Sequence, residues 1–389
     1  MYQRHLDERL LNHVENRREI TVLLGARQVG KTTILKRLFP KAQYFLVDNE
    51  PVQKSLERYD VAVYRQLLDP SVNVVVIDEI HRLSDPGRAA KIFFDQIPEK
   101  KLIITGSSSF SIKNKATESL AGRRIDYHLY PLTFTEYLSQ LGIRRDLDFP
   151  ILTKIPHGFK RDEDVARTFD LPAILEKVLL FGLYPVMVSQ PADKLYLKNL
   201  AESVVFKDLL ELSLVENRSA AIALLKLLAF QIGQLVNVAE LADKAKLDVK
   251  TVQRYLSLFE QSFLIFFLPP FSFRGRDEIS KMPKVYFYDL GLRNALIENF
   301  HPVAIRPDAG AMLENFIVSE AIKENYYGDF GYKLYFWRTK AGAEMDLVLT
   351  REKELVGWEV KSRYKSAGQA FGSRYPNAQV GVVTGENFL

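Results

Sequence analysis

The residues best suited to do chemistry stand in one short stretch, residues 25–33, with the sequence Gly-Ala-Arg-Gln-Val-Gly-Lys-Thr-Thr. It fits the phosphate-loop pattern G-x-x-x-x-G-K-[ST]. In such a loop the glycines let backbone N–H groups turn toward phosphate, and the following helix adds its positive N-terminal end. Lys31 is expected to contact the β- and γ-phosphates of ATP, and Thr32 to hold Mg²⁺. The residues expected to bind the nucleotide are Gly25, Ala26, Arg27, Gln28, Val29, Gly30, Lys31, Thr32 and Thr33.

An acidic pair, Asp78-Glu79, closes an apolar, β-branched run at residues 72–77. Acids at strand ends also occur in ordinary turns. With a phosphate loop earlier in the chain, the pattern favours catalysis: Asp78 is expected to bind in the Mg²⁺ shell, and Glu79 to orient and deprotonate the attacking water.

A further polar group follows the apolar run at residues 101–105. If that strand lies between the two strands just described, its tip can sense the γ-phosphate. Ser107 is the first candidate for this role, with Ser108 as the other serine and Thr105 as a possible contributor. The alternative is that the serines only make a turn.

A third group of chemically capable residues lies near the C-terminus. Asp346 stands in a strand-like segment at 344–349, and Glu359 and Lys361 share one face of the next, at 355–361. Two carboxylates can hold a divalent cation, and a lysine beside them can position or activate water against a phosphodiester. The alternatives are a salt bridge at a sheet edge and a nuclease fold kept only for binding.

This C-terminal pattern resembles that of the PD-(D/E)XK nucleases. The resemblance implies a restriction-endonuclease-like domain in which Asp346 and Glu359 are metal ligands. It also implies a further acid from the preceding helix, for which Glu320 is the first choice and Glu314 the second. DNA cleavage and a degenerate fold both remain open.

Two arginines, Arg123 and Arg124, stand just before an apolar run at residues 125–130. The order of elements resembles the AAA+ ATPases, in which an arginine at this place reaches the γ-phosphate held by a neighbouring subunit. Arg123 is the first candidate for this role, which would imply a homo-oligomer: a dimer or a ring, including a hexamer. The alternative is a surface pair favoured by the helix dipole.

A helix-turn-helix pattern precedes the C-terminal region. Helical periodicity at residues 238–245 and 248–259 is followed by apolar runs at 264–268 and 285–288 that suit a wing. On the outward face of the second helix stand the residues predicted to contact duplex or branched DNA, Lys250, Thr251, Gln253 and Arg254. The expected wing tip carries Arg274, Arg276, Lys281 and Lys284. Winged helices also bind proteins, and that alternative stays open.

These elements predict a multidomain α/β chain. We expect a parallel-sheet P-loop core of the ASCE/AAA+ type at residues 1–138, a helical lid or linker at 139–215, a winged helix at 216–295 and the nuclease-like domain at 296–389.

Composition limits the remaining possibilities. The 389-residue chain has 53 Lys and Arg against 48 Asp and Glu, a mild excess that permits nucleic acid as a partner without requiring it. The absence of cysteine excludes disulfides, zinc-thiolate sites and thiol catalysis. A charged N-terminal region and short, proline-broken apolar stretches predict a cytoplasmic protein with no membrane partner.

Over nearly its whole length the chain resembles a prokaryotic family of AAA-type ATPases fused to a C-terminal region of uncharacterised function. The motifs that carry the resemblance lie at residues 25–32, 77–80, 105–108, 122–123, 131–136, 182–185, 336–346 and 358–361. His81 stands where the pattern has glutamine, and we expect it to touch no assigned role.

The resulting hypothesis is an ATP-binding and ATP-hydrolysing protein that binds and remodels or processes DNA. The alternatives are a slow ATP-dependent regulatory switch with an inactive nuclease-like domain and a defence- or toxin-linked nuclease gated by ATP.

Overall fold

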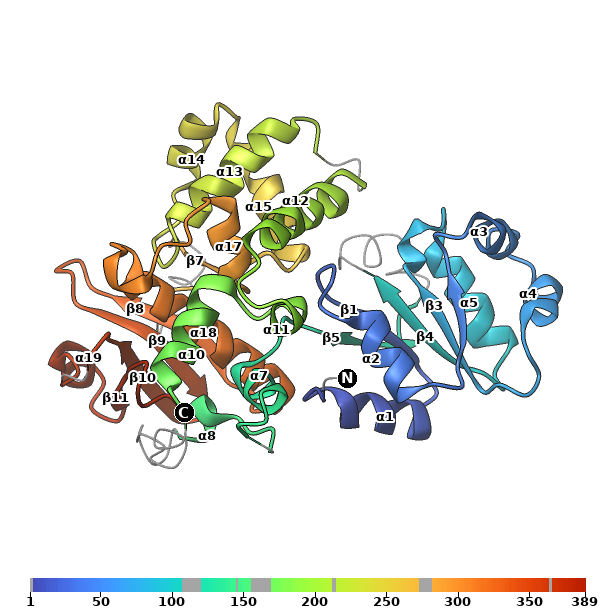
Figure 1. Cartoon of the computed structure of the whole chain (residues 1–389), viewed down its shortest axis with the longest axis horizontal. Helices are drawn as coiled ribbons and strands as arrows, with labels where there is room; N and C mark the ends of the chain where they lie inside the picture. Colours follow the sequence, from blue (N-terminus) through green and yellow to red (C-terminus); the bar gives the residue numbers. More distant parts are fainter. Residues whose placement is uncertain are drawn as a thin grey trace. The chain divides into compact units, whose positions relative to one another are not determined.

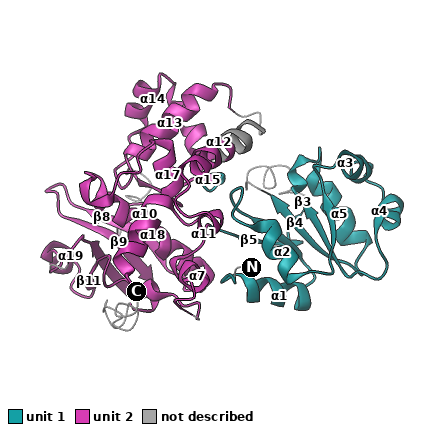
Figure 2. Ribbon diagram, in the orientation of Figure 1, with its two compact units in different colours: residues 1–130, 207–214, 261–263 teal, residues 131–206, 215–260, 264–389 magenta. Residues whose placement is uncertain are grey.

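A computed structural model describes residues 3–106, 120–144, 146–154, 169–211, 215–272, 282–363 and 366–389, with the side chains of 204–211 left out. The chain forms two compact units, coloured separately in Figure 2. Unit 1 comprises residues 1–130, 207–214 and 261–263, and unit 2 comprises 131–206, 215–260 and 264–389.

Unit 1 is built on a five-stranded parallel sheet (Figure 1). Its strands are β1 (Ile20–Leu24), β2 (Gln43–Leu46), β3 (Val74–Asp78), β4 (Lys101–Gly106) and β5 (Arg124–His128). They lie in the order β2-β3-β4-β1-β5. The strand ending at Thr105-Gly106 therefore lies between the phosphate-loop strand and the Asp78 strand, as predicted. Their carboxyl ends meet at one edge of the sheet.

The helices of unit 1 connect these strands. They are α1 (Asp7–Asn16), α2 (Lys31–Leu38), α3 (Glu50–Leu56), α4 (Val61–Leu67) and α5 (Pro86–Gln96), with a short 3-10 helix, η1 (Ile80–Arg82). Because parallel crossovers are right-handed, α2 lies on one face of the sheet and α3 to α5 on the other. The inner strand β1 is buried along its whole length, as expected for a strand covered on both faces.

Unit 2 is mostly helical in its first part. Its helices before the first strand are α7 (Phe134–Gln140), α8 (Pro150–Thr153), α10 (Leu171–Phe181), α11 (Val186–Ser189), α12 (Lys194–Glu211), α13 (Arg218–Phe230), α14 (Val238–Ala245) and α15 (Val249–Gln261). The last residues of α12, from 207 on, and Gln261 at the end of α15 belong to unit 1. The first stretch of unit 1 ends at residue 130, so α7 belongs to unit 2, whereas the sequence predicts a border at residue 138. None of the described helices in either unit combines the length and apolarity that a membrane crossing requires.

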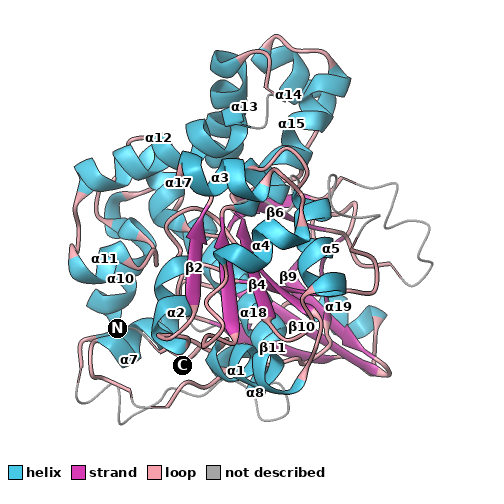
Figure 3. Ribbon diagram, turned by 90° about the vertical axis from the view of Figure 1, so that its right-hand side faces the viewer, coloured by secondary structure: helices cyan, strands magenta, loops and turns pink. Residues whose placement is uncertain are grey.

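Helices α13, α14 and α15 lie together (Figures 1 and 3) and are followed by an antiparallel pair, β6 (Ile265–Leu268) and β7 (Lys284–Phe287). Side chains cap two of the helices: Asn217 accepts from the backbone of α13, and Asn237 from that of α14. An isolated bridge pairs Leu235 with Lys284, which adds a third chain segment beside β7.

The C-terminal part of unit 2 contains α17 (Leu290–Leu296), the short η2 (Val303–Ile305), the long α18 (Ala309–Tyr327) and a four-stranded sheet. The sheet is made of β8 (Lys333–Arg338), β9 (Glu344–Arg351), β10 (Glu354–Val360) and β11 (Gln379–Val383), with α19 (Gln369–Arg374) before the last strand. Strands β8, β9 and β10 form an antiparallel meander, and β11 joins β10 in parallel. Trp337, Met345, Val348 and Phe371 form a buried cluster between the sheet and α19.

Candidate active site

The phosphate loop joins β1 to α2 at the carboxyl edge of the unit 1 sheet. A Cβ atom at Gly25 would lie 2.2 Å from the carbonyl oxygen of Leu129, so no other residue fits there without a backbone shift. Gly30 has φ 96°, a left-handed conformation that glycine adopts without strain. Ala26 and Val29 are fully buried and hold the loop against the core. The two glycines of the motif are thus required by backbone geometry.

The side chains of the loop point into the same region. The Lys31 ammonium is almost fully buried and donates to the carbonyl oxygens of Gly25 (2.8 Å) and Ala26 (3.1 Å). Thr32 Oγ1 donates to Asp78 Oδ2 at 2.7 Å. Of the other loop residues, Arg27 is half-buried, and Gln28 and Thr33 are exposed.

Asp78 is held from two strands. Its second oxygen, Oδ1, accepts a hydrogen bond from Thr105 Oγ1, and that same hydroxyl oxygen accepts from the Glu79 backbone N–H at 3.1 Å. Thr105 is fully buried. The hydroxyl of β4 therefore fixes both acids of the pair, which gives Thr105 a position that the sequence indicated only as secondary.

Glu79 follows β3 in a left-handed backbone conformation, with φ 57° and ψ 42°, which is uncommon outside glycine. Such conformations concentrate at functional sites. Burial raises the pKa of the Glu79 carboxyl above its ordinary value, and the nearby Lys31 ammonium opposes part of that shift. Its Oε2 lies 3.3 Å from His81 Nδ1. The expectation that His81 touches no assigned role is therefore wrong.

The arrangement suits a nucleotide and Mg²⁺. A buried ammonium, a hydroxyl paired with a carboxylate, and a second carboxylate of raised pKa stand beside a loop that turns into a helix N-terminus. Lys31 can meet phosphate charge, Thr32 and Asp78 offer the oxygen ligands that Mg²⁺ prefers, and Glu79 can take a proton. When bound, Mg²⁺ would neutralise phosphate charge.

Arg4, which the sequence analysis did not single out, braces this loop from the N-terminal side. It is buried, and its guanidinium donates to the carbonyl oxygens of Val29 (3.1 Å) and Tyr130 (2.7 Å). No motif marks it, because an arginine in an amphipathic N-terminal segment normally belongs to a solvated face.

Two further residues of unit 1 were predicted to act here, Ser107 and Arg123. Ser107, like Ser108, is outside the described residues. Arg123 lies at the opposite edge of the sheet, since its carbonyl accepts from Ile20 N–H at the start of β1, and its guanidinium pairs with Asp95 at 3.1 Å. It therefore cannot serve the phosphate loop of its own chain, and any contact with nucleotide must be made to another copy.

The C-terminal acids make two sets of ion pairs, one with Lys284 and one with Lys361. Lys284 Nζ, from β7, lies 2.8 Å from Glu314 Oε1, 2.6 Å from Glu344 Oε1 and 3.8 Å from Asp346 Oδ1. Asp346 Oδ2 also accepts from the Val360 backbone N–H at 2.8 Å. Burial, with Glu314 nearby, raises the pKa of Asp346 to about 7. We call Lys284, Glu314, Glu344 and Asp346 the Lys284 cluster.

Glu359 and Lys361 form the second set, as an ion pair of 3.1 Å. Glu359 Oε2 also accepts from the Gly368 N–H, and Lys361 donates to the Ser366 carbonyl. The register pairs Trp358 with Leu347, which puts Glu359 and Asp346 on one face of the sheet. Within the described residues, no three His, Cys, Asp or Glu side chains are arranged to hold a metal ion.

The expectation that Glu320 joins the C-terminal acids is wrong. Glu320 is buried against other elements: its Oε2 accepts from the Phe134 N–H at 2.8 Å, and its other oxygen pairs with Lys323. Glu314, the second choice, is the α18 acid that lies with Asp346. Six residues apart on a helix, the two acids point to different sides.

The residues predicted to contact DNA all lie on α15, but they differ in exposure and in the contacts they make. Lys250 and Gln253 are exposed. Thr251 takes part in the helix cap, since its backbone N–H donates to Asp248 Oδ1 at 2.9 Å. Arg254 is exposed but pairs with Glu216 at 3.2 Å. Of the expected wing-tip residues only Lys284 is described, and it is buried.

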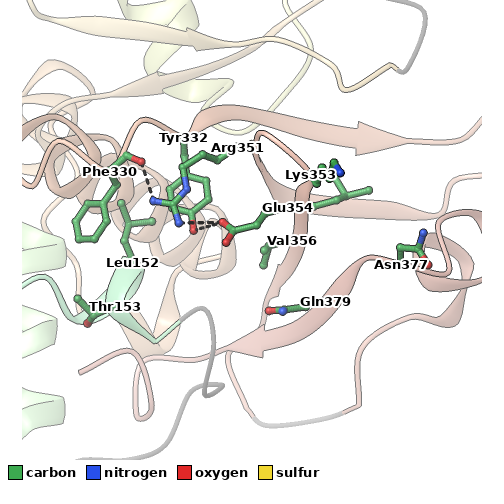
Figure 4. A pocket seen from close by; sticks show the side chains of 11 residues that line it. Leu152, Thr153, Phe330, Tyr332, Arg351, Lys353, Glu354, Val356, Asn377 and Gln379 are labelled. Carbon is green, nitrogen blue, oxygen red and sulfur yellow. Dashed lines mark hydrogen bonds and ion pairs between the residues drawn. The ribbon is translucent and has the colours of Figure 1, made fainter.

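A pocket of about 450 Å³ opens at the β9–β10 hairpin of unit 2 (Figure 4). Arg351 crosses it, donating to the Phe330 carbonyl and to Glu354, and lies 4.3 Å from the ring of Tyr332. The hairpin is at the other end of β9 from Asp346, so this pocket belongs to neither group of acids.

Family models match three parts of the chain. Residues 17–138 match an AAA domain, residues 173–302 match a domain of unknown function (DUF8612), and residues 309–387 match another (DUF4143).

Similar proteins extend over most of the chain. An uncharacterised protein of Methanocaldococcus jannaschii is 24% identical over 404 residues, covering 98% of this chain and 84% of its own. One of Haemophilus influenzae is 23% identical over 336 residues (80% and 76%), and one of Mycobacterium tuberculosis is 24% identical over 364 (90% and 72%).

Among solved structures, a Walker-type ATPase of Pyrococcus abyssi has a TM-score of 0.49 at 15% identity, covering 76% of this chain and 96% of its own. RuvB of Thermotoga maritima has a TM-score of 0.33 at 15% identity (71% and 94%). The family match, the strand order of unit 1 and the phosphate-loop geometry agree, and residues 17–138 form an AAA-type ATPase domain.

Proposed function

We propose that this protein binds ATP with Mg²⁺ and hydrolyses it in unit 1, and that it uses the hydrolysis to act on DNA through unit 2. The observation that carries the first part is the shared hydrogen-bond network of the phosphate loop and the acid pair. Thr32 and Thr105 hold the two oxygens of Asp78, and Thr105 also receives the N–H of Glu79.

In this scheme each side chain has one task. Lys31 meets the negative charge of the β- and γ-phosphates, and Thr32 with Asp78 holds the metal shell. Glu79 orients water and accepts its proton, for which its raised pKa is suitable because a base works best when its pKa approaches the operating pH. His81, 3.3 Å from Glu79, positions that carboxylate.

The test separates binding from hydrolysis. Glu79→Gln should bind ATP with wild-type affinity and lose turnover, whereas Lys31→Ala should lose binding itself. Fluorescent-ATP titration and phosphate release measure the two quantities. A Glu99→Gln variant, which changes an exposed glutamate of the same unit, is the matched control. Wild-type ATP turnover in Glu79→Gln would contradict the role of Glu79 as the catalytic base.

DNA is proposed as the partner of unit 2. Supporting it are the succession of α13, α14, α15, β6 and β7, which suits a winged helix, and the exposed Lys250 and Gln253 on α15. The order of α18, β8, β9, β10, α19 and β11 suits a nuclease-like fold. Phosphate contacts by basic residues would make binding fall steeply with salt.

The DNA proposal is tested by binding and ATP turnover on linear, forked and four-way DNA at low and moderate salt. Binding and stimulation of hydrolysis support it. Normal hydrolysis without any DNA binding at low salt contradicts it and leaves the ATPase assignment intact.

A regulatory switch is the second candidate, in which ATP holds one arrangement that a protein partner recognises. The observation that favours it is the absence, within the described part of the chain, of an acidic group arranged for metal-dependent cleavage. Slow ATP turnover without stimulation by DNA would distinguish the switch from a DNA-acting enzyme.

Assembly into a dimer or ring is proposed from Arg123, which lies too far from the phosphate loop of its own chain to act there.

A further inference from the structure

The Lys284 cluster places a single buried ammonium among three carboxylates. The Lys284 side chain is only 3% exposed, and its Nζ lies within 3.8 Å of Glu314, Glu344 and Asp346. The carboxylates come from two different elements, α18 and β9, and the lysine comes from a third, β7. Tyr286, two residues along β7, adds a hydroxyl that donates to Glu314 at 2.6 Å.

We propose that the Lys284 ammonium is the resident cation of this acidic group, in the place where a nuclease-like fold would hold a divalent metal, and that it excludes such a metal. Glu314 from the helix and Asp346 from the middle strand are the acids that the fold brings together, and Lys284 lies against both. In this arrangement Asp346 holds no metal and does not support metal-dependent cleavage. ATP hydrolysis by unit 1 is not needed for any part of this.

Charge explains why a lysine can stay there. An isolated ammonium in a buried site would be costly, so it must be paired. Burial alone lowers the pKa of Lys284, but Glu314, Asp346 and Glu344 raise it more, and its pKa lies above the ordinary value. The lysine therefore stays charged. The ring of Phe336, 5.5 Å away, adds a favourable face for the cation.

Geometry explains why a divalent cation does not fit beside it. Mg²⁺ requires close, nearly octahedral oxygen ligands. Here Glu314 and Glu344 each direct an oxygen to Nζ, and Asp346 uses one oxygen on the Val360 N–H. A metal bound by the same oxygens would also lie within a few ångströms of the ammonium, where like charges repel strongly.

The experiment uses the full-length chain and Mn²⁺ alone, without nucleotide, with bound Mn²⁺ counted by electron paramagnetic resonance. Comparing wild type with Asp346→Asn isolates this site from any Mn²⁺ at Asp78. We expect no difference between them. Mn²⁺ binding by wild type that Asp346→Asn abolishes would overturn the proposal, and this comparison needs no variant of Lys284.

A second arm removes the ammonium. Lys284→Met, of similar length but uncharged, should gain about one Mn²⁺ per chain, and Mn²⁺ should raise its melting temperature more than that of wild type. The gain should disappear in the double variant with Asp346→Asn, and Lys284→Arg should behave as wild type. A folded Lys284→Met that gains no Mn²⁺ would also overturn the proposal. If Lys284→Met does not fold, the wild-type comparison decides.

Discussion

Replacing Thr105 by valine tests the hydrogen-bond network of the candidate active site most directly. The two side chains have nearly the same shape, so the change removes a hydroxyl without opening a cavity. Thr105 is fully buried, and its hydroxyl donates to Asp78 and accepts from the Glu79 N–H. Valine leaves both partners without this contact.

The size of the effect follows from the two lost contacts. A buried polar group left unpaired costs about 1–3 kcal/mol, and more when charged. With Asp78 still held by Thr32, we expect Thr105→Val to lower the free energy of unfolding by about 2–5 kcal/mol. Looser placement of Asp78 and Glu79 should lower kcat about 10–100-fold, or about 1.4–2.7 kcal/mol in the barrier.

The assay is steady-state ATP hydrolysis at a temperature where the variant is folded, together with urea unfolding. Thr105→Ser keeps the hydroxyl and is the matched control, which should retain most of the activity. If Thr105→Val hydrolyses ATP like wild type while remaining folded, the hydroxyl does not position the acid pair and the reasoning fails.

Three further predictions follow from other contacts. Arg123→Ala should lower ATP turnover per chain and remove the dependence of turnover on protein concentration. Asp95→Ala breaks the same partly exposed ion pair, and it should lower the free energy of unfolding by no more than about 1 kcal/mol and leave turnover unchanged. ATP turnover measured at several protein concentrations distinguishes these results. Burial raises the pKa of Glu324 well above its ordinary value. The protonated Glu324 therefore stabilises the fold fully below the pKa it has in the unfolded chain, and this contribution declines as pH rises toward its pKa in the folded protein. Glu324→Gln does not titrate, so it should lose less stability than wild type over that pH range, measured as urea midpoints against pH. Replacing Lys250 with alanine should weaken DNA binding and reduce its salt dependence, whereas Gln253→Ala should leave the salt slope unchanged; fluorescence anisotropy at several salt concentrations measures both.

Local pattern was enough to place most of the elements of unit 1. The strand before the phosphate loop and the strand before Asp78 are apolar and bounded by turn residues, so their positions follow from short-range signals. The strand order also puts Thr105 beside Asp78, as the sensing hypothesis required. His81 could not be placed in this way, because its contact depends on the turn that follows Glu79.

The sequence could not show which acid of α18, Glu314 or Glu320, lies with Asp346. An amphipathic helix reveals its buried face by its apolar residues, but α18 is buried on nearly every side, and its inward and outward faces cannot be told apart from the sequence. Both Glu314 and Glu320 therefore fitted an inward position. Only the packing of β7 on one side and α7 on another separates them.

Lys284 was expected at an exposed wing tip and is instead buried. Its partners Glu314 and Glu344 are 30 and 60 positions away in the sequence. No periodicity links residues so far apart, and a lysine is normally read as a surface group. The short helix α19 and the strand β11 were not predicted either. The strand β11 forms by pairing with β10, which comes earlier in the chain, and this pairing leaves no local signal in the sequence.

The encirclement of α18 has a consequence for how this polypeptide can be shortened. Its carboxylates Glu320 and Glu324 receive the amide ends of α7 and α8, and Asn315 makes two hydrogen bonds with the backbone of Phe287. A fragment ending before residue 309 would lack these side chains. The N–H groups at the start of α7 and α8 and the backbone of Phe287 would then lose their hydrogen-bond partners together. Residues 309–389, the last fifth of the sequence, therefore supply partners on which the rest of unit 2 depends, and a truncation there should unfold the whole of that unit.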